Sequence, residues 1–119
     1  MSNDERLTAR QFQQADGVED WRVLAFGASA WFDAPSHTAG SALARRIAEL
    51  TGRTGRPPDV DLRARGVHVR IGTTGPAGLT VADVASARTI SAAARDLGLA
   101  AEQSAVQSLQ LTTRSTSHR

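Results

Sequence analysis

The stretch RPPDVDLRARGVHVRIGTTGPAGLTVAD, residues 56–83, decides the fold. Apolar and polar residues alternate over 59–65 and again over 67–72, a period of two that is typical of strands with one buried face. Gly66 stands between the two runs and is expected to allow a tight turn. Residues 73–78 interrupt regular structure, and Leu79 and Thr80 then open a helix. The stretch therefore predicts a β-hairpin, a loop and a helix, with any pocket at the ends of the hairpin.

This stretch resembles the core of the pterin-4a-carbinolamine dehydratase family. The positions that match the family pattern are Pro58, Asp59, Val60, Asp61, Leu62, Thr73, Gly78, Leu79, Thr80 and Asp83. The family carries a His-His-Pro segment before the first strand and a Thr-Thr-His segment before the helix. In this chain Arg56 and Pro57 occupy the positions of the His pair, and Thr74 occupies that of the third His. The resemblance covers residues 7–103 and is interrupted at these three positions.

The resemblance implies a saddle-like antiparallel sheet and assembly into a homodimer or homotetramer. It also implies a small-molecule substrate, because in the family a pterin ring lies between the His pair and the third His. One of those histidines moves protons while the 4a-hydroxyl group leaves. A small sheet with unpaired edges gives an independent physical reason to expect an oligomer.

The order of elements supports an α+β fold without the family. A helix is expected after the Thr8 cap and should stop at Asp16-Gly17, and two strands, 21–26 and 28–33, should form a hairpin around Gly27. A second helix is expected from the Ser36 cap to Thr51, with Gly52 as a left-handed stop. The last helix should begin with a capping box of Thr80 and Asp83 and end at Gly98.

The expected order α-β-β-α-β-β-α fits one four-stranded antiparallel sheet with helices packed on one face. The buried stripes expected on the second and third helices are Ala39, Leu43, Ile47 and Leu50, and Val81, Val84, Ala87, Ile90, Ala94 and Leu97. Residues 1–103 are expected to form the domain. Residues 104–119 are expected to be an extension, with a weak edge strand over 105–111 and a disordered tail.

Composition excludes several classes of protein. The 119 residues suit one domain, and no apolar run approaches the length of a membrane span. There is no cysteine, so disulfides, thiolate metal sites and thiol nucleophiles are excluded. The pI near 10.9 does not indicate a nucleic-acid binder, because the net charge is only +2 and the basic residues are all arginines spread along the chain. Residues 1–6 lack the apolar stretch of a signal peptide, so a cytoplasmic location is expected.

The candidate ligand-binding residues are those of the loops around the hairpin. Arg56 can clamp an anionic or enolate-like group with paired donors, but its guanidinium does not release a proton near neutrality. Asp59 or Asp61 is therefore the expected base. Further ligand contacts are expected from Pro57, Thr73, Thr74, Trp31 and Asp83, and a plain solvated loop residue is the competing interpretation of Arg56.

His68 is the third candidate catalytic residue, since imidazole titrates near neutrality. Its place in mid-strand on the polar sheet face also suits a solvated or interface histidine. His37 should lie in the first turn of the second helix, where a surface role is expected. Trp31 and Phe32 should point to opposite sides, with one buried and the other open to a pocket or a partner. No metal site and no cofactor are expected, because no His and acid pair has metal-ligand spacing.

Three functions remain open at this point. The first is a repurposed lyase or cyclase that acts on a small cyclic metabolite of a biosynthetic pathway. The second is 4a-hydroxytetrahydrobiopterin dehydration with substitute acid and base groups. The third is a non-catalytic binding or dimerisation protein, because the family includes a dimerisation cofactor of a transcription factor.

Overall fold

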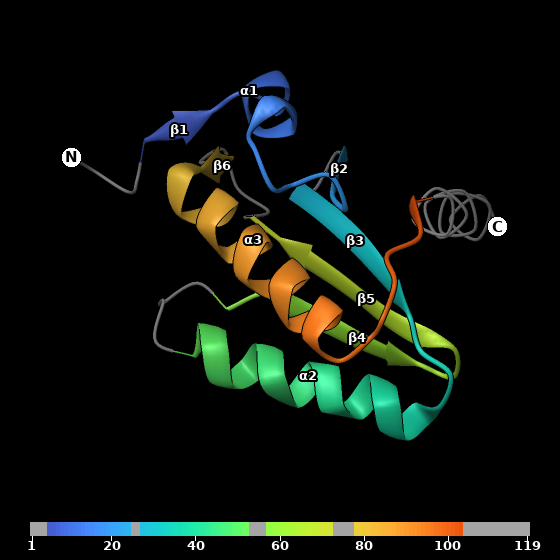
Figure 1. Cartoon of the computed structure of the whole chain (residues 1–119). Helices are drawn as coiled ribbons and strands as arrows, with labels where there is room; N and C mark the ends of the chain where they lie inside the picture. Colours follow the sequence, from blue (N-terminus) through green and yellow to red (C-terminus); the bar gives the residue numbers. More distant parts are fainter. Residues whose placement is uncertain (1–4, 25–26, 53–56, 73–77, 104–119) are drawn as a thin grey trace, which may run out of the picture.

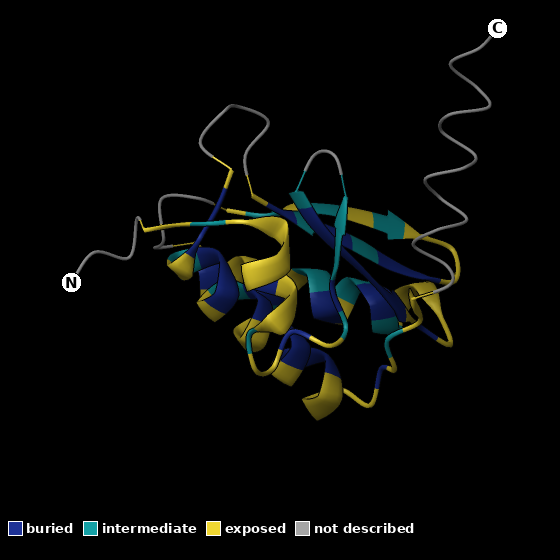
Figure 2. Ribbon diagram, turned by 90° about the horizontal axis from the view of Figure 1, so that it is seen from above, coloured by how far each residue is buried: buried dark blue, intermediate teal, exposed yellow. Residues whose placement is uncertain are grey.

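The computed structural model describes residues 5–24, 27–52, 57–72 and 78–103. The elements in chain order are β1 (Arg6–Leu7), α1 (Ala9–Gln14), β2 (Arg22–Leu24), β3 (Gly27–Asp33), α2 (His37–Thr51), β4 (Asp59–Arg63), β5 (Gly66–Ile71), β6 (Leu79–Thr80) and α3 (Val81–Asp96). Helices α2 and α3 lie side by side against one face of the sheet (Figure 1). Their buried residues face that sheet (Figure 2).

The main sheet has the strand order β2-β3-β5-β4, and every neighbouring pair is antiparallel. The α+β fold and the four-stranded antiparallel sheet predicted from the sequence are therefore confirmed. A second sheet of two short strands was not predicted. In it Arg6 pairs with Thr80 and Leu7 pairs with Leu79. Strands of two residues each are too short to show an alternation of apolar and polar residues in the sequence.

The helix starts were predicted correctly from local capping signals. Thr8 and Gln11 exchange two hydrogen bonds at the start of α1, of 2.8 and 3.1 Å. The hydroxyl of Ser36 accepts a hydrogen bond from the Ala39 N–H at 3.1 Å. The helix ends were predicted less well: α3 stops before Gly98, as expected, and Gly98 has a φ of 75°, but Gly52 has φ −63° in the right-handed region. The expectation of a left-handed stop at Gly52 was wrong.

The core lies between the sheet and the helices. Its fully buried large side chains include Phe12, Trp21, Phe32, Leu43 and Ile47. The expected helix stripes are confirmed in their middles, where Leu43, Ile47, Val84, Ala87, Ile90 and Ala94 are buried. They were wrong at their ends, since Leu50, Val81 and Leu97 are 43%, 37% and 37% exposed. Periodicity alone does not say how far along a helix the covering sheet extends.

Two glycines serve close packing rather than the turns expected of them. Gly66 is the first residue of β5 and pairs with Arg63, so the turn itself is Ala64-Arg65. A Cβ on Gly66 would lie 2.7 Å from Cε2 of Trp31 and 2.6 Å from the Phe32 carbonyl oxygen. Gly27 is likewise inside β3, with φ 128°, and a side chain there would meet the Ile71 carbonyl oxygen.

Residues Leu99–Gln103, called the strap below, return from α3 to the edge of β3. The Asp33 N–H donates to the Ala100 carbonyl at 2.8 Å, and the Glu102 N–H donates to the Trp31 carbonyl at 2.9 Å. Leu99 is buried at the root of the strap. The strand expected over 105–111 and the tail expected after it lie outside the described residues.

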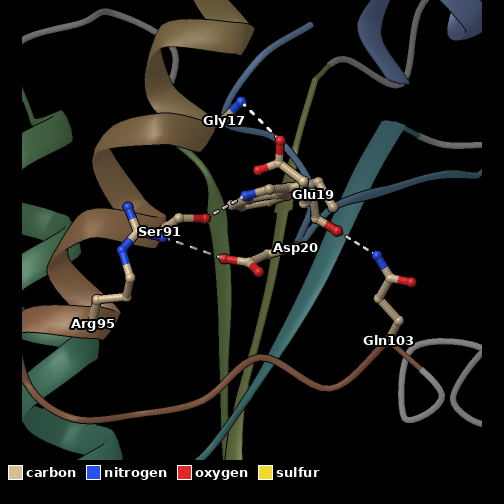
Figure 3. A network of polar contacts seen from close by, with 7 residues as sticks. Gly17, Glu19, Asp20, Ser91, Arg95 and Gln103 are labelled. Atoms are coloured by element: carbon tan, nitrogen blue, oxygen red, sulfur yellow. Dashed lines mark hydrogen bonds and ion pairs between the residues drawn. The ribbon is translucent and has the colours of Figure 1, made fainter. Parts of the chain in front are cut away.

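A polar network joins the segment before β2 to α3 and to the strap (Figure 3). The Trp21 indole N–H donates to the Ser91 hydroxyl at 3.0 Å, and both side chains are buried. Asp20 lies 4.0 Å from Arg95, and the Gln103 amide donates to the Glu19 carbonyl. These contacts hold the start of β2 against the helix layer. Among the described residues, no helix is long and apolar enough to cross a membrane.

Candidate functional site

The predicted site residues separate into two groups on different parts of the sheet. Strand residues that do not face the helices form the outer face, defined here by Arg22, Ser29, Trp31, Asp33, Asp59, Asp61, Arg63, His68 and Arg70. The other group lies where β4 begins, β5 ends and α3 starts, and is called the Leu79 end. It comprises Pro57–Asp59, Ile71–Gly72 and Gly78–Asp83. Asp59 belongs to both groups.

The register aligns the outer-face residues in rows across the strands. One row is Arg22, Ser29, Arg70 and Asp59, and the next is Trp31, His68 and Asp61. Side chains directly opposite each other in an antiparallel pair project from the same face, with Cβ atoms about 4.5–5.5 Å apart. The three predicted catalytic residues, Asp59, Asp61 and His68, therefore do lie near one another.

Both catalytic candidates of β4 are ion-paired. Oδ2 of Asp59 lies 2.8 Å from Nη2 of Arg70, and Oδ2 of Asp61 lies 2.7 Å from Nη2 of Arg63. The Asp59 side chain is 74% exposed and that of Asp61 is 50% exposed. Exposed pairs of this kind contribute about 0–1 kcal/mol to stability. Either carboxylate can therefore exchange its partner for a ligand at little cost.

His68 lies between Asp61 on β4 and Trp31 on β3 and is half-buried. Burial lowers the pKa of its imidazole; Asp61 opposes this shift, and Arg70 and Arg63 add to it. The lowered pKa favours the neutral imidazole, the form that can accept a proton. Its mid-strand place lies one row further from the Leu79 end than Asp59.

Trp31 is far less open to a ligand than the sequence suggested. We expected one of Trp31 and Phe32 to be buried and the other exposed, but their exposed fractions are 9% and 1%. The alternation itself holds, since Phe32 joins the core and Trp31 does not. The indole lies over Gly66, which has no side chain to displace it, and Nε1 donates to Oδ1 of Asp33 at 2.7 Å. The expectation of an exposed ring was therefore wrong.

The Leu79 end brings several chain segments together. A Cβ on Gly72 would lie 2.8 Å from Cδ2 of Leu79 and 3.3 Å from Cα of Gly27, so the end of β5 packs against both β6 and β3. Asp83 is 4% exposed, and Oδ2 accepts a hydrogen bond from the Thr80 N–H at 2.8 Å. The predicted capping box is confirmed, and it positions Asp83 at the start of α3.

Three of the predicted ligand-binding residues, Arg56, Thr73 and Thr74, lie outside the described residues. Pro57 follows Arg56 in the sequence; it is exposed and precedes β4. His37 is exposed in the first turn of α2, as expected for a surface role. No group of three metal-ligating side chains occurs within residues 5–24, 27–52, 57–72 and 78–103.

Arg22 and Ser29 were not among the predicted site residues. They share a row with Asp59 and Arg70 only because β2 and β4 lie on opposite sides of the β3-β5 pair. The signal in the sequence was the polar position that each occupies in an alternating strand. Assigning them to this row required the strand order, which the sequence pattern did not specify.

Comparison with known proteins gives one consistent family. The model of "Pterin 4 alpha carbinolamine dehydratase" matches residues 4–93. A curated protein of Nocardia farcinica (strain IFM 10152), named "Putative pterin-4-alpha-carbinolamine dehydratase", is 35% identical over 95 residues, covering 80% of this chain and 95% of the relative. A solved structure, the transcriptional coactivator/pterin dehydratase from Brucella melitensis, superposes with a TM-score of 0.66. Its identity is 19%, over 76% of this chain and 99% of that one, so it supports the fold alone.

Proposed function

The chain belongs to the pterin 4 alpha carbinolamine dehydratase family, and we propose that it removes water from a 4a-hydroxytetrahydropterin. The observation that carries this proposal is the family match over residues 4–93, together with a 35% identical relative that this chain covers almost completely. Dehydratases of this kind are lyases. The sheet and α3 supply a scaffold of the same fold as a solved pterin dehydratase.

The reaction needs two proton transfers. The C4a–O bond breaks and the hydroxyl leaves as water after it receives a proton. The N5–H proton is lost, and its electron pair forms the C4a=N5 double bond. Positioned acids and bases typically contribute about 10²–10⁴-fold to such steps. No oxidant or reductant is consumed.

Asp59 is the carboxylate that we propose as the base. It is the first residue of β4, directly after Pro57 and Pro58, and thus stands at the Leu79 end, where the family motif occurs. Its side chain is 74% exposed, so the 2.8 Å ion pair with Arg70 contributes little to stability. Arg56, three residues earlier, is proposed to bind the electron-rich ring system as an electrostatic anchor. Asp83 is proposed to shape this end through its capping box.

Asp61 provides a matched control for Asp59. Both are aspartates of β4 on the outer face, and each has an arginine partner at about the same distance. Formation of the quinonoid product from a 4a-hydroxytetrahydropterin would be followed by absorbance and compared with the rate in buffer alone. Asp59→Asn is expected to lower kcat by about 10²–10⁴-fold, and Asp61→Asn is expected to leave it near the wild-type value.

The two parts of the proposal fail separately. A wild-type rate equal to the rate in buffer contradicts the dehydratase function. A fast wild-type enzyme whose Asp59→Asn variant is equally fast leaves the function intact and removes Asp59 from it.

A second candidate is a lyase or cyclase acting on another small ring. It is supported by the resemblance described above, in which Arg56, Pro57 and Thr74 fall at the positions expected for the family's histidines. This candidate predicts no acceleration of pterin dehydration and no thermal stabilisation by a dihydropterin analogue. A stabilising analogue at a hundredfold excess over its Kd would contribute about 2.7 kcal/mol and would argue for the pterin instead.

A further inference from the structure

Arg22 is the anomalous polar side chain of the outer face. Its Nε atom is enclosed and has no hydrogen-bond partner, although the residue is only half-buried. Within the described part of the chain, Arg22 forms no ion pair either. An enclosed N–H without an acceptor costs free energy, so such groups are rare in native proteins and call for an explanation.

Among the described residues, the acidic side chains of this face pair with other groups and not with Arg22. Asp59 is taken by Arg70 and Asp61 by Arg63, at 2.8 and 2.7 Å. The Asp33 carboxylate accepts the Trp31 indole N–H. Each of these acidic side chains therefore has a partner, whereas the Arg22 guanidinium has none within residues 5–24, 27–52, 57–72 and 78–103.

Ser29 and Arg70 complete the surroundings of Arg22. Ser29 pairs with Arg22 on one side and with Arg70 on the other, so all three side chains project from the outer face in one row. Ser29 is only 3% exposed, although none of the described helices covers this face. The two arginines are two strand spacings apart, about 10 Å. Their long side chains can therefore reach one small ligand above Ser29.

We propose that Arg22 and Arg70 bind an oxyanion, a phosphate or carboxylate group, above Ser29 on the outer face. Two guanidiniums that flank a hydroxyl are suited to such a group, because each offers a planar fork of donors to its oxygens. Arg22 contacts the ligand through its Nη donors, because Nε is enclosed while the residue as a whole is only half-buried. Arg70 keeps Asp59 through Nη2, which leaves its other donors for the ligand. The site adjoins the Leu79 end through the Arg70–Asp59 pair, but the proposal does not depend on the proposed dehydratase function, because its test measures binding directly.

The test follows the side-chain Nε–H resonance of Arg22 by NMR during titration of the full chain. Inorganic phosphate forms one arm and acetate the other, each at constant ionic strength held with sodium chloride. A saturable shift of this resonance is expected in at least one arm. A response to phosphate alone identifies a tetrahedral oxyanion, and a response to acetate alone identifies a carboxylate.

Variants make the assignment specific. Arg22→Gln is expected to weaken binding by roughly tenfold to a hundredfold, read from Trp fluorescence, since Trp31 lies in the adjacent row. Arg22→Lys keeps the charge without the Nε donor and the fork, and is expected to bind with intermediate strength. Arg45→Gln is the control, because Arg45 lies exposed on α2 beside Glu49. No shift beyond the chloride control, or equal binding by Arg22→Gln and wild type, would overturn the proposal.

Discussion

His68 connects the stability of the sheet to pH at the scale of one residue. Burial lowers the pKa of its imidazole from the ordinary histidine value of 6.5. The unfolded chain therefore binds a proton at a higher pH than the folded chain does. Stability is fully present above the unfolded pKa and is lost as the pH falls through the folded pKa. The free energy of unfolding should thus decrease between pH 7.5 and pH 5.5.

His68→Gln isolates this contribution, because glutamine is polar but does not titrate. Urea unfolding of both proteins at pH 7.5, 6.5 and 5.5 gives, for each protein, the slope of the free energy of unfolding against pH. The variant is expected to lose less stability than the wild type over this range. Parallel slopes would show that His68 has the same pKa in the folded and unfolded chains, contrary to its burial between Asp61 and Trp31.

Alternation in the sequence was enough to assign His68, Asp59 and Asp61 to one face, because side-chain direction in a strand depends only on position. It was not enough to predict the burial of Trp31. That burial depends on Gly66, which lies on the neighbouring strand and leaves room for the indole. Exposure of a strand residue is set across strands, by residues distant in the sequence.

At the scale of one element, the start of α3 depends on its cap. Thr80 is 4% exposed, and its hydroxyl accepts from the Asp83 N–H while its own N–H donates to the Asp83 carboxylate. Thr80→Ala is expected to lower the free energy of unfolding by about 1 kcal/mol, within a range of about 0.5–2 kcal/mol. Urea unfolding followed by circular dichroism measures it.

Thr89→Ala is the matched control for Thr80→Ala. Thr89 is an exposed residue in the middle of the same helix, and alanine has the higher helix propensity. The control is expected to be neutral or slightly stabilising. If both variants lose the same stability, the effect belongs to the loss of threonine in general and the cap contributes nothing.

The caps of α1, α2 and α3 were predictable because a cap is a contact between residues three apart in the sequence. The pairing of β1 with β6 was not predictable, because Leu7 and Leu79 are far apart in the sequence and only the complete fold brings them together. The candidate site likewise contains one contact that is local in the sequence and one row that depends on the fold. The Thr80 and Asp83 pair was visible in the sequence, whereas the row of Arg22, Ser29 and Arg70 appears only once the strands are ordered.

At the scale of the whole molecule, β3 has two short neighbours along one edge. β2 pairs with Gly27–Ser29. The strap lies along the same edge further on, at Trp31–Asp33, where it forms hydrogen bonds with the Trp31 carbonyl and the Asp33 N–H. An uncovered strand edge offers backbone groups to other chains and promotes association. The strap therefore has two roles that follow from its position, which are to stabilise the sheet and to keep this edge of β3 closed.

Glu102→Pro tests both roles, because proline removes the N–H that donates to the Trp31 carbonyl. Loss of this hydrogen bond with an acceptor left unpaired is expected to cost about 1–3 kcal/mol in urea unfolding. Glu102→Ala keeps the N–H and loses the same side chain, so the difference between the two variants measures the lost backbone bond together with the backbone restriction that proline adds. Sedimentation velocity should show more self-association for the proline variant than for the alanine variant. Equal stability and equal sedimentation would mean that the strap lies against β3 without holding it.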